Sequence, residues 1–161
     1  MVVFNVEQYK GSAEENYLLA EKQLIALIED EPNRIANLSN ASALLNQLLD
    51  HVNWVGFYLV EGNELILGPF QGLPACVRIP LGRGVCGTAA SERRTLRVQD
   101  VHQFPGHIAC DAASRSEIVI PIIKDDELIG VLDIDSPITD RFTELDERML
   151  KKFIESLTTY L

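Results

Sequence analysis

The spacing of hydrophobic residues changes twice along the chain, and these changes predict where helices give way to strands. Between residues 13 and 29 hydrophobic side chains recur every three or four positions, and Pro32 follows them, as at the end of an amphipathic helix. A second stripe of the same period covers residues 35–50, so we expect two helices that pair in antiparallel fashion. The helical period returns after Thr143, which has with Asp146 the spacing of a capping box. The sequence therefore predicts helices at both ends of the chain.

The middle of the chain has the short, β-branched and aromatic segments that are typical of strands. We expect strands over residues 53–60, 64–67, 76–81, 95–98, 118–123 and 128–134. The last two are separated by a polar four-residue turn and form the clearest hairpin. Residues 82–93 begin with a glycine-rich stretch and continue with residues that are compatible with a helix. Residues 100–114 are expected to form a loop with about one helical turn. These elements predict an α+β fold with a largely antiparallel sheet, the terminal helices on one face and a ligand pocket on the other.

Composition and charge predict the number of domains, the compartment and the kinds of partner that are not expected. We see no repeat, low-complexity segment or linker, so we expect a single domain over residues 1–161. The first 16 residues lack the pattern of a secretion signal, and no stretch approaches the about 18 apolar residues of a membrane span. We therefore expect a cytoplasmic protein that does not bind membranes. A net charge of −10 repels phosphate backbones, so nucleic acid is not an expected partner.

The three cysteines, Cys76, Cys86 and Cys110, lie in the middle of the chain, and none has the two-residue spacing of a zinc knuckle. Lasting structural disulfides are unusual in the reducing cytoplasm, whereas transient catalytic disulfides do occur there. An odd number also leaves one thiol outside any single disulfide. The cysteines alone leave two interpretations open: buried small hydrophobic residues, or thiol redox chemistry.

Acidic residues on the predicted hairpin form a second candidate site. Strand alternation sends Asp133 and Asp135 to one face, while Leu132 and Ile134 point to the other. Glu117 stands just before the paired strand, so three carboxyl groups are expected to converge. A solvated sheet edge is the alternative. If the groups are buried, a cationic ligand or protonation of one acid would relieve their repulsion.

Two neighbouring patterns suggest a binding pocket. Trp54 and Tyr58 lie on one side of the first strand, with Gly56 between them leaving space; they form either a pocket wall or part of the core. Three glycines surround Cys86 ahead of the predicted helix, and backbone N–H groups there would suit a carboxylate. These glycines are Gly82, Gly84 and Gly87.

His102, His107 and Cys110 allow a competing interpretation as a zinc site. The other cysteines are distant in sequence, and neither a CxxC nor an HExxH element is present. We therefore expect no metal and no cofactor, and a structural role for His51.

Five segments together resemble the free methionine-(R)-sulfoxide reductase family, whose members are single GAF domains. They are NWVGFYL at residues 53–59, GRGVCG at 82–87, QDVHQFPGHIACD at 99–111, SEIVIPI at 116–122 and GVLDIDSP at 130–137. The resemblance covers nearly the whole chain. It implies a GAF-like fold and the thiol-dependent reduction of free L-methionine (R)-sulfoxide, through a cysteine sulfenic acid and an intramolecular disulfide, in a homodimer recycled by thioredoxin or a similar dithiol.

The resemblance also implies residue roles. Cys110 would be the nucleophile, with Cys76 and Cys86 as recycling cysteines. The substrate would be bound and polarised by Glu117, Asp133 and Asp135, and its methyl end would face Trp54. Its carboxylate would meet backbone N–H groups near Gly84 to Thr88. The expected substrate-binding residues also include Tyr58, Val85 and Gly87. Which acid protonates the sulfoxide oxygen stays open.

One alternative function belongs to a different class. A GAF-type sensory module would bind a nucleotide or metabolite without turnover, and it would have to pass its signal to a separate partner. Consumption of a reductant on adding free methionine sulfoxide separates the two functions, because a sensor would bind without turnover.

Overall fold

The structure, a computed structural model, describes residues 8–161, so the start of the segment assessed for a secretion signal lies outside the described residues. Six strands form one antiparallel sheet in the order β3-β2-β1-β6-β5-β4. The strands are β1 (Trp54–Glu61), β2 (Glu64–Gly72), β3 (Arg78–Pro80), β4 (Leu96–Val98), β5 (Ser116–Lys124) and β6 (Glu127–Ser136). The helices are α1 (Ala13–Ile28), α2 (Arg34–Leu48), α3 (Gly84–Glu92) and α4 (Glu144–Thr158), with a short 3-10 helix, η2 (Val101–Gln103). The predicted α+β class is confirmed.

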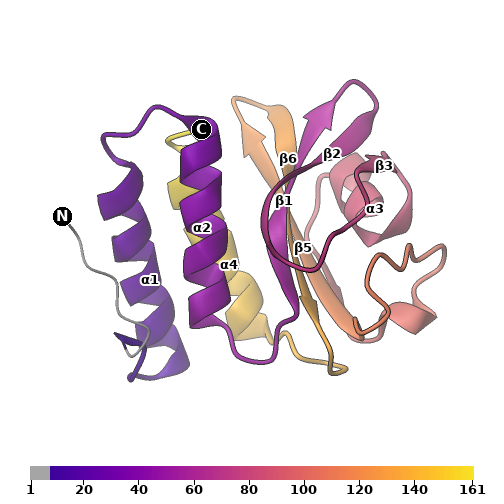
Figure 1. Cartoon of the computed structure of the whole chain (residues 1–161), viewed down its shortest axis with the longest axis horizontal. Coiled ribbons are helices and arrows are strands. Elements are labelled where there is room, and N and C mark those ends of the chain that lie inside the picture. Colours follow the sequence, from indigo (N-terminus) through magenta and orange to yellow (C-terminus); the bar gives the residue numbers. More distant parts are fainter. Residues whose placement is uncertain (1–7) are drawn as a thin grey trace.

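Three helices lie on one side of the sheet (Figure 1). Helices α2 and α4 pack on the strands, and α1 packs against both of these helices. The apolar core between helices and sheet includes Phe57, Leu132 and Ile134, which are almost completely buried. The prediction that helices cover one face is therefore confirmed, with α1 forming an outer layer.

Hydrogen bonds at the start of α4 explain why this helix begins where the sequence predicts. Thr143 is the N-cap and forms the expected capping box with Asp146. Asp146 is buried and also accepts hydrogen bonds from the Tyr17 hydroxyl at 2.7 Å and from Arg141 at 3.1 Å. This one carboxylate therefore ties α1 to α4.

Strands β5 and β6 are each three residues longer than predicted, which brings Glu117 and Asp135 inside the sheet, and β2 and β3 also differ from the prediction. Strand β2 continues to Gly72 instead of ending at residue 67, because Gly68 and Pro69 are accommodated in a bulge opposite Phe57. Strand β3 is shorter than expected, and Cys76 lies before it in the β2–β3 loop. The opposite face of the sheet carries α3 and the loops that contain Cys76 and Cys110 (Figure 1).

No helix in the described part of the chain combines the length and the apolar character that a membrane span needs.

Candidate active site

Strand register brings three predicted site residues into one row. Trp54 on β1 pairs with Asp135 on β6, and Asp135 pairs in turn with Glu117 on β5. Directly opposed residues in an antiparallel sheet point to the same face, so these side chains are neighbours. Asp133 lies two residues before Asp135 and therefore also points to this face. The predicted convergence of the three acids is confirmed.

The three carboxyl groups lie in a poorly solvated environment. Glu117 and Asp133 are buried, with exposed fractions of 5% and 6%, and Asp135 is half-buried. Burial raises the pKa of Glu117 well above its usual range, and the neighbouring Asp133 and Asp135 raise it further. Burial also raises the pKa of Asp133 to about 6 and that of Asp135 well above its ordinary value. This cluster therefore holds protons at a pH where exposed carboxyl groups are ionised.

One oxygen in the cluster lacks a partner. Asp133 Oδ1 is buried and has no hydrogen-bond partner among the described residues. A buried carboxylate oxygen without a partner is costly, so this atom is a natural acceptor for a ligand N–H group.

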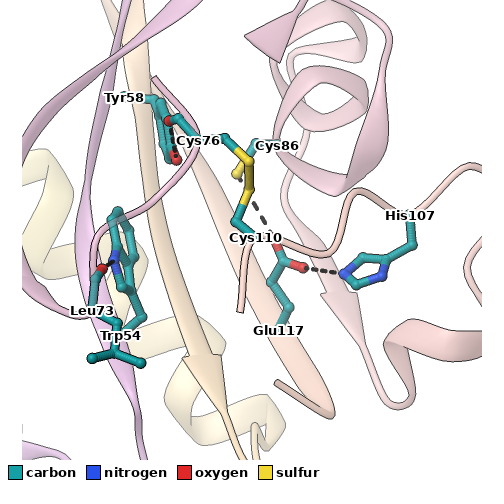
Figure 2. The surroundings of a disulfide bond; sticks show 8 residues. All are labelled: Trp54, Tyr58, Leu73, Cys76, Cys86, His107, Cys110 and Glu117. Carbon is teal, nitrogen blue, oxygen red and sulfur yellow. Dashed lines mark hydrogen bonds and ion pairs between the residues drawn. A yellow bond between two sulfur atoms is a disulfide. The ribbon is translucent and has the colours of Figure 1, made fainter. Parts of the chain in front are cut away.

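Two of the three cysteines are bridged. Cys76 and Cys110 form a disulfide with a Cα–Cα distance of 5.7 Å, and it joins the β2–β3 loop to the loop after η2 (Figure 2). Cys110 lines the same cavity as Glu117, Asp133 and Asp135. Cys76 and Cys110 therefore lie close enough to form a disulfide at the edge of this cavity.

Cys86 is a buried free thiol on α3. Its sulfur lies 3.7 Å from Glu117 Oε1, a contact drawn in Figure 2. Burial raises the pKa of the Cys86 thiol, and the charges of Asp133, Glu117 and Asp135 raise it further. Cys86 therefore stays protonated, and it serves the carboxyl cluster as a hydrogen-bond donor.

Aromatic side chains form one wall of the cavity. Trp54 stacks on Tyr58 with ring centroids 5.8 Å apart and on Phe70 at 5.2 Å. The Trp54 indole N–H donates to the Leu73 carbonyl, and the Tyr58 hydroxyl donates to the Cys76 carbonyl (Figure 2). Gly56 leaves no empty space, because a Cβ there would lie 2.3 Å from the Cβ of Phe70. The expectation of open space at Gly56 is wrong: this position admits Phe70 and the Trp54 ring.

The start of α3 forms another wall. Arg83 is the N-cap, and Arg83, Gly84 and Val85 line the cavity. The first N–H groups of a helix have no intrahelical acceptor, so the backbone here offers donors to an anion.

Gly87 does not take part in this wall. It is absent from the cavity lining, and its N–H donates to the Arg83 carbonyl at 3.0 Å. A Cβ at Gly87 would lie 2.4 Å from the Pro80 carbonyl oxygen. Gly87 thus allows close packing of α3 on the preceding loop, and we do not retain it as a substrate-binding residue.

The zinc trio considered from the sequence is not assembled. Cys110 is bridged to Cys76, whereas His107 Nε2 lies 4.0 Å from Glu117 Oε2 (Figure 2). Burial and the nearby His102 lower the pKa of His107, so it is neutral near pH 7. Within residues 8–161, the side chains that lie close enough together to share a metal ion are those of Cys86, Glu117 and Asp133.

The cavity is partly open to solvent, so a ligand can reach these side chains from outside. The sequence did not place four polar lining residues in the pocket: Arg83, His107, Asp111 and Ser114. Arg83, His107 and Asp111 lie within motifs already singled out, but only the folded structure shows that they face this cavity.

One family model, a relative and two solved structures show what this chain is similar to. Residues 33–161 match the family model described as GAF domain. A relative from Escherichia coli (strain K12), named free methionine-R-sulfoxide reductase, is 52% identical over 147 residues, covering 91% of this chain and 89% of the relative. A structure of fRMsr of Staphylococcus aureus, described as a complex with substrate, has a TM-score of 0.87 and 66% identity and covers 91% of this chain and 95% of its own. A free methionine-R-sulfoxide reductase from Neisseria meningitidis, also in complex with its substrate, has a TM-score of 0.91 and 41% identity, with coverage of 99% and 94%.

Proposed function

The chain belongs to the GAF domain family and to the free methionine-R-sulfoxide reductases, which are oxidoreductases, and on that premise we propose that it reduces free L-methionine (R)-sulfoxide to L-methionine. One structural observation carries the proposal: Cys110 lines the same cavity as Glu117, Asp133 and Asp135. A cavity of this kind brings a thiol and acidic groups to one small substrate.

The acids and the helix start suit the two charged ends of a free amino acid. Asp133 and Asp135 bind the substrate ammonium in this proposal, which gives the unpartnered Asp133 Oδ1 a donor. The substrate carboxylate meets the Val85 backbone N–H and the side chain of Arg83 at the cavity wall. A methionine sulfoxide within a peptide lacks both charges and is excluded.

The aromatic wall suits the other end of the substrate. Trp54 and Tyr58 face the methyl group and the side-chain methylenes, because their rings offer the apolar surface of the cavity.

The chemical step uses Cys110 and a protonated acid. The Cys110 thiolate attacks the substrate sulfur, and Glu117, whose pKa is raised, protonates the sulfoxide oxygen. The oxygen then passes to Cys110 Sγ as a hydroxyl group, and the bond between Cys110 Sγ and the substrate sulfur breaks. The products are methionine and a sulfenic acid on Cys110. The Cys76 thiol then attacks this sulfur and water leaves, giving the Cys76–Cys110 disulfide that the structure contains. Overall one sulfoxide and two thiols give one thioether, one disulfide and one water.

The disulfide also refines the roles of the recycling cysteines. The sequence resemblance assigned recycling to both Cys76 and Cys86. The bridge between Cys76 and Cys110 favours Cys76 as the resolving thiol. Cys86 has a raised pKa and lies against Glu117, so it is a poor nucleophile, and we propose that it orients the acid instead.

Cys110 shares its cavity with Glu117, Asp133 and Asp135, and ionised carboxylates repel a nearby thiolate. In this proposal the bound substrate ammonium offsets that repulsion, so Cys110 reacts when substrate is present. Equal thiolate titration curves with and without an unreactive substrate analogue would contradict this step.

Three further features complete the proposal. Thioredoxin or a similar dithiol reduces the disulfide, the protein works in the reducing cytoplasm, and two copies form a homodimer. Light scattering of the purified protein tests the last of these.

One assay tests the activity itself. The separate R and S epimers of free methionine sulfoxide and a blocked peptide form are each supplied with thioredoxin as electron donor. We expect steady consumption of reductant with the free R epimer alone. Binding of the epimer without consumption would favour the sensory module.

A further inference from the structure

Exposed hydrophobic side chains gather around the disulfide. Seven large hydrophobic side chains are exposed among the described residues, and three of them lie within three positions of a bridged cysteine. Leu73 and Val77 are each 62% exposed beside Cys76, and Ile108 is 38% exposed beside Cys110. We call the two segments that carry them, residues 71–78 and 102–110, the disulfide rim. Apolar surface concentrated at one functional feature is typical of a contact surface.

The disulfide rim also differs from the rest of the chain in charge. It contains no Asp or Glu, and Arg78 is its only formally charged residue, although the chain has a net charge of −10. Asp111 follows the rim, but its carboxylate accepts a hydrogen bond from Asn53 at 2.8 Å. A thiolate, or a partner with an acidic surface, therefore meets little repulsion at the rim itself.

The two sulfurs of the bridge are not equivalent. Cys110 lines the cavity with the three acids, whereas Cys76 is not part of the cavity lining. A thiolate that attacked Cys110 from the cavity would approach these acids, while attack on Cys76 keeps the incoming charge away from them. Attack on Cys76 also releases Cys110 as a free thiol in the cavity, where the next substrate binds.

Building on the proposed function, we propose that the disulfide rim is the docking surface for a protein that presents a dithiol, and that this partner attacks the sulfur of Cys76. A small dithiol needs no apolar contact area, whereas a protein gains affinity by burying Leu73 and Val77.

The step balances as a thiol–disulfide exchange. The first thiolate of the partner bonds to Cys76 Sγ, the Cys76–Cys110 bond breaks, and Cys110 leaves with the electron pair and takes up a proton. The second thiol of the partner then attacks the partner's own first sulfur and releases Cys76. The partner ends as a disulfide, both cysteines of this chain end as thiols, and two electrons are transferred.

The test measures reduction of the disulfide without any sulfoxide, so its result does not depend on the proposed activity. Oxidised protein is mixed with reduced thioredoxin or with dithiothreitol, and free thiols are counted over time after acid quench and alkylation. The variants are Val77→Glu and Leu73→Glu, with Ile35→Glu as the control, because Ile35 is 54% exposed on α2 in the helical layer. We expect the thioredoxin rate constant to fall at least about tenfold in the two rim variants and to stay within about twofold in the control, while dithiothreitol rates are unchanged.

Other results would overturn the docking surface. Equal slowing with thioredoxin and dithiothreitol would mean that the substitutions block the bridge itself. Unchanged thioredoxin rates in the two rim variants would mean that thioredoxin does not use the rim. A change in the molecular mass of these variants in solution would assign the rim to a second copy of this chain.

A trapping experiment tests the attacked sulfur. Thioredoxin in which serine replaces the second active-site cysteine should form a mixed disulfide that peptide mapping locates on Cys76, with Cys110 found as a thiol. Location on Cys110 would refute the assignment.

Discussion

The two faces of the sheet carry very different side chains although the same strands supply both. Toward α2 and α4, strands β5 and β6 present Ile118, Leu132 and Ile134 to an apolar core. Toward α3, the alternate positions include Val119 and Val131, which belong to a second apolar cluster, and also Glu117, Asp133 and Asp135, which are acidic and poorly solvated. The face toward α3 thus combines apolar packing with destabilising acidic groups that a substrate can use.

The largest expected effect concerns the thiols of the cavity face. Cys110→Ser should yield no methionine even in a single turnover, because the nucleophile is lost. Cys76→Ser should yield about one methionine per protein and then stop with thioredoxin, because the resolving thiol is missing. Quantifying methionine per protein checks both variants. Sustained turnover in Cys76→Ser would remove Cys76 from the mechanism.

Leu132 and Asp133 are adjacent on β6 and point to opposite faces of the sheet, so substitutions at these positions test each face separately. Leu132→Ala should lower the free energy of unfolding by about 2–5 kcal/mol, because it opens a cavity in the helix-covered core. Asp133→Asn should leave the fold intact and raise KM for the sulfoxide at least about tenfold, because a charge-assisted hydrogen bond to the ammonium is lost. Urea unfolding and steady-state kinetics measure the two effects. Unchanged kinetics in both Asp133→Asn and Asp135→Asn would return these acids to a structural role.

The pH dependence of stability should come mainly from the cavity face. The pKa of Asp133 rises from 3.8 to about 6 on folding, so the folded protein holds this proton at a pH where the unfolded chain has lost it. The free energy of unfolding of the ligand-free protein should therefore fall as pH rises from about 4 to about 6, and the raised pKa values of Glu117 and Asp135 act in the same direction.

Urea unfolding between about pH 4 and 7 checks this slope, which should be shallower in Asp133→Asn. Asp126→Asn is the matched control, because its side chain is fully exposed and it removes the same charge. Equal slopes in the two variants would contradict the prediction.

The smallest expected effect lies in the helical layer. Thr143→Ala removes the hydroxyl of the α4 N-cap and should lower stability by about 1 kcal/mol, while activity stays unchanged. Thr143→Ser should retain the stability. A loss of activity at a temperature where Thr143→Ala is folded would show that the two faces are coupled.

Local signals in the sequence predicted much of this fold. The β5–β6 hairpin and α4 form where period and capping indicate, because each depends on neighbouring residues. Alternation along β6 also placed Asp133 and Asp135 on one face. The continuation of β2 was missed, because Gly68 and Pro69 usually end a strand and their bulge depends on pairing with β1.

The site was less accessible to sequence reasoning. Cys76 and Cys110 are 34 residues apart on two irregular loops, and only tertiary packing decides which thiols meet. The same packing brings His107 and Arg83 to the cavity and turns Gly87 away from it. Residue types predicted the chemistry, but long-range contacts decide which groups can carry it out.

The row of Trp54, Asp135 and Glu117 has a consequence for biosynthesis. Strand β1 leaves the ribosome early, yet one of its two neighbours in the sheet is β6, the last strand to be made. The binding chamber therefore has no precursor in the nascent chain, since its floor closes only when β6 inserts between β1 and β5. A truncated translation product that ends before β6 retains all three cysteines but cannot hold a ligand between these strands.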